Sequence, residues 1–209
     1  MGNREDLMAG AKRCLTEKGY GRTTARDIAT ASGVSLAAIG YHFGSKEALL
    51  NAALIEATGE WGDVLGAVVA RANKTSDDPE ERFVAVWDGV LESIAAHRGL
   101  WASQFEAMVQ VERVPELREA LGEVQKNARL GLSALFQGLP EVADTEEELS
   151  RGTFYQALLV GLAGQWLAAP DMAPGGRGLL RGLELVGGSV LKRKSGEWHG
   201  AKDWHGPVA

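Results

Sequence analysis

Hydrophobic residues recur at three- and four-residue spacing in nearly every segment, and no convincing stretch alternates between apolar and polar positions. The first spacing places apolar side chains on one face of a helix, whereas strict alternation would indicate a strand. The pattern therefore predicts an all-α protein. We expect helices at about residues 4–18, 36–42, 80–97, 99–112, 116–138, 145–169 and 177–194, with two more that begin at Thr24 and Lys46.

Local start and stop signals divide the first fifty residues into short helices. Gly19 is a candidate left-handed stop for the first helix, and Thr24 with Asp27 three residues later forms a capping-box pattern. Gly33 suits a tight turn, after which Ser35 is expected to cap a third helix. A capped helix, a three-residue turn and a second short helix predict a helix-turn-helix, which places its second helix in the major groove of DNA.

The helix that begins at Lys46 is expected to continue past Val68, with one apolar stripe along its length. A helix of that length can link two domains. We therefore divide the chain into an N-terminal domain, residues 1–50, and a helical body, residues 51–194. Residues 195–209 lack periodicity and are rich in glycine, so we expect a flexible tail there.

The composition of the 209 residues, with 45% hydrophobic and 24% charged, is that of an ordinary globular protein. One cysteine, Cys14, leaves no internal disulfide and fits a reducing compartment. No apolar run approaches the roughly 18 residues that a membrane span needs, and no signal peptide is recognisable at the start. A cytoplasmic protein with no membrane partner is therefore expected.

Charge is distributed unevenly along the chain. The formal net charge is -6, but residues 1–50 carry +2 and the remainder carries -8. The first segment also gathers side chains that donate to phosphates or base edges around one short helix. They are Thr24, Arg26, Ser35, Tyr41, His42 and Lys46. The N-terminal domain is thus the part suited to approach nucleic acid, whereas phosphate would repel the acidic body.

Several short motifs, in this order and at this spacing, resemble the DNA-binding region of the tetracycline-repressor (TetR) family over about residues 7–50. They are Gly19-Tyr20, Thr23-Thr24, Asp27-Ile28-Ala29, Gly33-Val34-Ser35, Tyr41-His42-Phe43 and Ser45-Lys46-Glu47-Ala48-Leu49. The resemblance implies a homodimeric, all-helical transcription regulator, usually a repressor. It further implies an N-terminal three-helix DNA-binding domain and a C-terminal domain that dimerises and binds a small molecule, which releases the DNA.

The resemblance also assigns roles within the motif. Thr24, Tyr41, His42 and Lys46 would hold phosphates, Arg26, Ser35, Ala37 and Ala38 would face base edges, and Leu36 would contact a thymine methyl group. Two blander interpretations stay open, in which His42 packs at a helix end and Lys46 is an ordinary first-turn lysine. The departure from the family is Gly40, which either removes one phosphate contact or permits closer backbone approach.

Two such domains on one dimer would read half-sites about 34–36 Å apart, or a multiple of that, in an inverted-repeat operator. A small hydrophobic or aromatic effector would bind the body, where aromatic and methionine residues follow helical stripes. The same stripes are more often the pattern of an ordinary core. The candidate effector residues are Trp61, Trp87, Trp101, Phe105, Met108, Phe154, Gln165 and Trp166.

Other classes of protein find less support in the sequence. We recognise no catalytic motif, and we therefore expect no enzyme activity and no cofactor. The repeat Trp198-His199-Gly200 and Trp204-His205-Gly206 offers too few ligands for a metal site. The alternative function is a helical protein-interaction module with degenerate DNA binding. A steep dependence of binding on salt would separate DNA binding from that alternative.

Overall fold

The computed structural model describes residues 2–111 and 115–191, and all regular structure in these ranges is helical. The order is α1 (Asn3–Lys18), α2 (Ala25–Ser32), α3 (Leu36–Phe43), α4 (Lys46–Ala72), α5 (Pro79–Ala96), α6 (Arg98–Val111), α7 (Pro115–Gln137), α8 (Glu146–Ala168), a 3-10 turn at Pro170–Met172 and α9 (Gly176–Leu191). The all-α prediction is confirmed, with helix bounds within a few residues of those expected. The expected tail, 195–209, lies outside the described residues.

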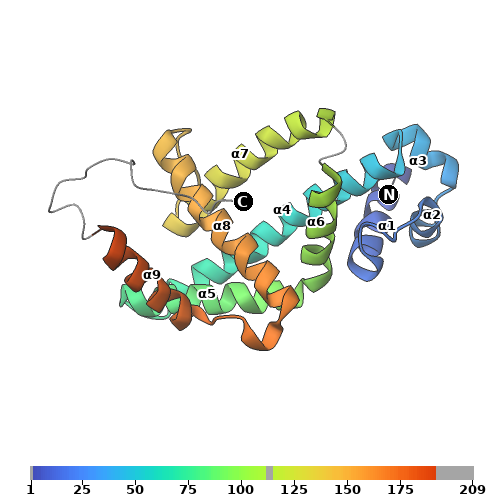
Figure 1. The fold of residues 1–209 in the computed structure, drawn as a ribbon. Helices are drawn as coiled ribbons and strands as arrows, with labels where there is room; N and C mark the ends of the chain where they lie inside the picture. The colour runs from blue at the N-terminus through green and yellow to red at the C-terminus, as the bar shows by residue number, and fades with distance from the viewer. Residues whose placement is uncertain (1, 112–114, 192–209) are drawn as a thin grey trace, which may run out of the picture.

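Figure 1 shows α1, α2 and α3 as a small bundle at one end of the molecule, from which α4 runs into the larger body. Two clusters of buried residues follow this arrangement. One joins α1–α3 to the start of α4, from Leu7 to Ala53, and the other begins on α4 at Trp61 and extends through α5, α6 and α8. The unbroken helix α4 thus contributes to both cores and crosses the expected boundary at residue 50.

The capping signals have mixed outcomes. Thr24 accepts a hydrogen bond from the Asp27 N–H and closes the predicted capping box, and Gly33 adopts the left-handed conformation with φ 71°. Gly19 has a positive φ of 87°, but its ψ of 167° lies outside the left-handed helical region. Ser35 stands at the N-cap of α3 without a side-chain capping bond, so the predicted cap is wrong in that respect. Its hydroxyl does not bond the first turn of α3.

Two hydrogen bonds and one close backbone contact dock the N-terminal bundle on α6. The Ser103 hydroxyl, which is buried, donates to the Leu15 carbonyl at 2.7 Å. The Glu106 carboxylate accepts from the Gly21 backbone N–H, also at 2.7 Å. Gly99, at the start of α6, lies directly against the Thr16 backbone of α1. The two parts of the chain therefore meet through close backbone contact as well as through α4.

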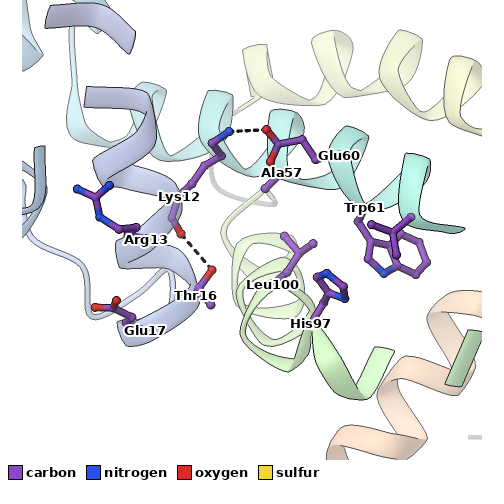
Figure 2. A pocket seen from close by; sticks show the side chains of 10 residues that line it. Lys12, Arg13, Thr16, Glu17, Ala57, Glu60, Trp61, His97 and Leu100 are labelled. Carbon is purple, nitrogen blue, oxygen red and sulfur yellow. Dashed lines mark hydrogen bonds and ion pairs between the residues drawn. The ribbon is translucent and has the colours of Figure 1, made fainter. Parts of the chain in front are cut away.

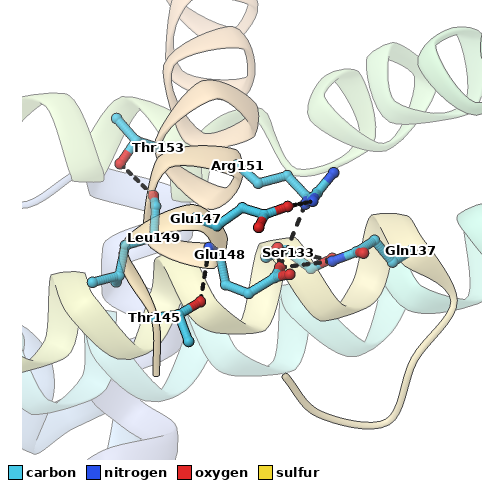
Figure 3. Close-up of polar contacts among 8 residues, drawn as sticks. All are labelled: Ser133, Gln137, Thr145, Glu147, Glu148, Leu149, Arg151 and Thr153. Carbon is cyan, nitrogen blue, oxygen red and sulfur yellow. Dashed lines mark hydrogen bonds and ion pairs between the residues drawn. The ribbon is translucent and has the colours of Figure 1, made fainter. Parts of the chain in front are cut away.

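Helices α7 and α8 pack against each other across a polar cluster (Figure 3). The buried Ser133 hydroxyl donates to the Glu148 carboxylate, which also accepts from the Gln137 amide at 2.8 Å. These donors and Arg151 hold the pKa of Glu148 below its usual value. The cluster therefore joins the two helices through side-chain hydrogen bonds. Within the described ranges, no helix is both long and apolar enough to cross a bilayer.

Candidate nucleic-acid interface and effector region

The exposed face of α3 carries the residues that the sequence assigned to DNA. Tyr41 is 86% exposed and Leu36 is 48% exposed, although both are large and apolar or aromatic. Ile39, on the opposite face, is buried against the bundle. Ser35 and Ala37 are also exposed, whereas Ala38 is half-buried. An aromatic side chain held out in solvent on a short, anchored helix is available to a partner surface.

The neighbouring residues are placed by specific contacts. His42 is half-buried and packs edge-on against the Tyr41 ring, with centroids 4.9 Å apart. Lys46 is the first residue of α4, where it donates to the Thr23 carbonyl at 3.1 Å and lies 3.3 Å from the Glu47 carboxylate. The Lys46 ammonium therefore ties α4 to the start of the helix-turn-helix. These contacts also agree with the structural interpretations, in which His42 packs at a helix end and Lys46 is an ordinary first-turn lysine.

Helix α2 supports this face through its first turn. Thr24 and Arg26 are exposed there, and the Thr24 hydroxyl donates to the Asp27 carboxylate at 2.7 Å. Lys18 on α1 lies 2.5 Å from the other Asp27 oxygen and joins α1 to α2. Opposite-sign pairing and hydrogen bonding to the carboxylate together stabilise its charged form. The pair holds the first turn of α2, which carries Arg26, against α1.

Arg4 is a neighbour that sequence reasoning missed. Its guanidinium lies over the Phe43 ring, 5.2 Å from the centroid, and holds the start of α1 against the end of α3. No motif signalled the contact, because Arg4 and Phe43 are distant in sequence. Gly40 is exposed, and a Cβ added to it would meet nothing within 4 Å. A side chain larger than that of glycine would therefore have room at this position.

The Asp27 pair gives a prediction about pH. Lys18 and both polar groups of Thr24 hold the pKa of Asp27 far below its ordinary value. A carboxyl group depressed in this way stabilises the fold above its unfolded pKa, about 3.9, and loses that contribution as pH falls through the folded pKa. We expect Asp27→Asn to lower the free energy of unfolding more at about pH 7 than at about pH 3. Urea unfolding of both proteins at each pH checks this, and equal losses at both pH values would contradict it.

The candidate effector residues are not gathered around one cavity. Trp87 and Trp101 are buried in the core of the body. Phe105 and Trp166 pack against that core, half-buried. Met108 and Phe154 are 55% and 49% exposed, and Gln165 is also exposed. The stripes therefore divide between core and surface.

Trp61 is the member of that set that lines a described cavity. Its indole N–H donates to the Ser93 hydroxyl at 2.9 Å, and its ring meets Trp101 edge-on with centroids 5.0 Å apart. The cavity, of about 370 Å³, lies between α1, α4 and the start of α6 (Figure 2). A second cavity of about 400 Å³ lies between α4 and the end of α7. Sequence reasoning missed both, since their linings are assembled from distant segments.

The geometry defines a class: an all-helical protein with an N-terminal helix-turn-helix whose second helix faces solvent. Residues 7–53 match the model of the bacterial regulatory proteins of the tetR family. The HTH-type transcriptional repressor AcnR of Corynebacterium glutamicum is 29% identical over 196 residues, which cover 91% of this chain and 94% of that protein. The N-terminal segment, residues 7–53, therefore belongs to the tetR family of bacterial regulatory proteins, the family that the motifs of this segment resemble.

Solved structures agree on the fold. A transcriptional regulator from Rhodococcus sp. Rha1 superposes with a TM-score of 0.57 at 24% identity, covering 90% of this chain and 96% of that one. A member of the TetR family from Streptomyces coelicolor A3 superposes with a TM-score of 0.61 at 22% identity, covering 88% and 98%. Both likenesses extend through the body, beyond the segment that carries the motifs.

Proposed function

We propose that this protein is a homodimeric repressor that binds an inverted-repeat operator and is released by a small hydrophobic or aromatic effector. The observation that carries the DNA-binding part is the solvent-facing surface of α3, with Tyr41 and Leu36 exposed on a helix anchored by Ile39. Thr24, Arg26 and Lys46 flank that surface and supply phosphate and base-edge donors. The likeness to AcnR, which is named a repressor, supports the proposed sign of regulation.

The dimer is proposed to form through the last two helices. Helix α9 exposes four large apolar residues, and Phe154 is exposed on α8. The four on α9 are Leu183, Leu185, Val186 and Val190. Exposed apolar side chains of this number on one helix favour a partner surface that covers them. A two-fold dimer would place two copies of α3 on successive half-sites, about 34–36 Å apart or a multiple of that.

The effector is proposed to bind among the aromatic residues of the body. Trp101 supports this location, because its indole N–H is buried and has no hydrogen-bond partner among the described residues. An unpaired buried donor costs about 1–3 kcal/mol. A ligand that offered an acceptor atom to this N–H would recover that cost. The other candidates that border this core are Trp61, Trp87, Phe105 and Trp166, with Met108, Phe154 and Gln165 towards the surface.

The test is selection of operator from a random duplex pool with the purified protein. We expect an inverted repeat to be enriched and its affinity to fall steeply with salt, with a log–log slope of about 0.9 per phosphate contact. Salt-steep binding without a motif would indicate nonspecific packaging, and no binding would favour the protein-interaction alternative. The selected complex can then be used to find effectors, which must release the DNA and change tryptophan fluorescence over the same concentration range.

Two substitutions test the docking of α3. Lys46→Ala and Tyr41→Ala are each expected to weaken operator binding, and loss of the Lys46 contact should reduce the salt slope by about 1. Lys74→Ala is the matched control, since Lys74 is exposed in the turn after α4. Affinity is measured by fluorescence anisotropy, and thermal unfolding confirms that each variant is folded. Unchanged affinity in both variants would refute the docking model.

A further inference from the structure

Arg4 differs from most cations of the N-terminal bundle because its charge has no protein acceptor. Five of the Lys and Arg side chains in residues 1–50 are committed to carboxylates or backbone carbonyls: Lys12, Arg13, Lys18, Arg22 and Lys46. The other two, Arg4 and Arg26, make neither an ion pair nor a side-chain hydrogen bond within residues 2–111 and 115–191. Arg26 already belongs to the proposed DNA-binding surface. We propose that Arg4, which lies outside the helix-turn-helix, also contacts the operator and that its guanidinium binds a phosphate of the DNA backbone.

The contact with Phe43 places Arg4 beside α3. The Arg4 guanidinium lies 5.2 Å from the centroid of the Phe43 ring, at the end of α3, although Arg4 itself belongs to the first turn of α1 (Figure 1). Leu36, Gly40 and Phe43 are spaced by four and three residues, so they follow one side of α3. Leu36 and Gly40 are exposed on that side. Arg4 therefore extends the exposed surface of α3 along one flank.

The dimensions of the major groove direct a cation in this place to phosphate rather than to bases. An α-helix with its side chains is about 10–12 Å across, and the major groove is about 12 Å wide. When α3 fills the groove, its exposed face meets base edges and its flanks meet the sugar-phosphate backbones. Gly40 on the same flank carries no side chain, and a Cβ there would meet nothing within 4 Å, so a DNA backbone has room to approach. A phosphate on this side would come next to the Arg4 guanidinium.

The aromatic contact leaves Arg4 able to bind an anion. A phenyl ring attracts the cationic charge but has no lone pair, so the five N–H donors of the guanidinium stay available. Their planar fork matches two oxygens of one phosphate. The carboxylate adjacent in the sequence, Glu5, accepts from the Gly2 backbone N–H at 3.3 Å within its own turn. Phe43 therefore holds the cation in place without neutralising it.

The inference rests on the operator binding proposed above and specifies what Arg4 adds to it. A phosphate contact contributes affinity for any duplex and carries no base readout. Each such contact releases counterions and contributes about 0.9 to the log–log salt slope, which makes one contact worth about five- to tenfold in affinity at about 0.1 M salt. The sequence that the protein selects should therefore not depend on Arg4.

The test measures binding of Arg4→Gln and of the parent protein to the selected operator and to a scrambled duplex, by fluorescence anisotropy over a range of salt concentrations. We expect Arg4→Gln to bind both duplexes about five- to tenfold more weakly at about 0.1 M salt, with a salt slope lower by about 1. Arg4→Lys keeps the charge and should keep the slope. Arg71→Gln is the matched control, because Arg71 is exposed near the far end of α4, and it should change neither quantity.

Ethylation interference locates the contact on the DNA. One phosphate whose ethylation weakens binding of the parent protein should have no effect on Arg4→Gln, while the other sensitive phosphates stay sensitive. Weaker binding with an unchanged salt slope would show that Arg4 acts only by holding α1 against α3, and would overturn the phosphate contact. Unchanged affinity of Arg4→Gln would also overturn it and leave the operator proposal standing, whereas a parent protein that binds no duplex would overturn both. Thermal unfolding confirms that each variant is folded.

Discussion

Replacing Trp87 by alanine is expected to lower the free energy of unfolding by about 3–5 kcal/mol. Trp87 is 1% exposed and lies between two aromatic rings, stacked on Phe136 at 5.4 Å and tilted against Phe83 at 6.0 Å. Removing the indole deletes a large apolar volume that the rigid helices around it cannot refill. The measurement is urea unfolding followed by circular dichroism, with the midpoint and the slope both recorded.

The control for this variant is Met172→Ala, since Met172 is 84% exposed in the turn before α9. We expect that change to stay within about 0.5 kcal/mol. A similarly small loss for Trp87→Ala would contradict tight packing around this indole. It would instead indicate that Trp87 borders open space, as a residue of an effector cavity would. The variant thus separates the two interpretations of the aromatic stripes.

Gly99→Ala is expected to disturb the contact between the helix-turn-helix and the body. A methyl group at this position would collide with the Thr16 carbonyl and its neighbouring backbone atoms, which cannot rotate away as a side chain would. Overpacking of this kind costs about 1–3 kcal/mol, and occasionally more. We expect a lower free energy of unfolding and faster proteolytic cleavage between residues 19 and 24, where the bundle would detach from α6.

Gly59→Ala on α4 is the matched control and should have the opposite sign. A Cβ at Gly59 meets nothing within 4 Å, so alanine there gains helix propensity, about 0.5–1 kcal/mol, without a clash. Thermal unfolding and limited proteolysis are compared for the two variants. Equal stability of Gly99→Ala and the parent protein would show that α1 and α6 can separate without cost.

The DNA-binding end was predictable because its signals are local. Thr24 with Asp27 and the turn at Gly33 each specify a helix boundary within a few residues, and the structure places the boundaries there. Ser35 shows the limit of such rules, since an N-cap position does not guarantee a capping bond. The contacts that join the bundle to α6 were not predictable. Ser103 and Leu15 are 88 residues apart, and nothing in either segment specifies the other.

The effector region was less predictable for a different reason. A stripe of aromatic residues shows which face of a helix turns inward, but it does not show whether the interior is filled. Trp61 and Trp101 fill their space by packing edge-on, whereas Met108 on the same helix as Trp101 faces solvent. Helix α6 turns one face to the N-terminal bundle, as Ser103 shows, and this leaves less of its surface for the body. The spacing of hydrophobic residues does not reveal that one helix packs against two neighbours.

Helix α4 passes from the DNA-binding bundle into the body without a break over 27 residues. At 1.5 Å per residue it is about 40 Å long. A rigid rod of that length that tilts by about 5° about one end displaces the other by about 3.5 Å, close to the 3.4 Å rise between successive nucleotides on a DNA strand. A repacking of the body too small to alter any helix would therefore shift α3 by one base-pair step. In a dimer, the distance between the two copies of α3 would then no longer match the fixed spacing of the operator half-sites.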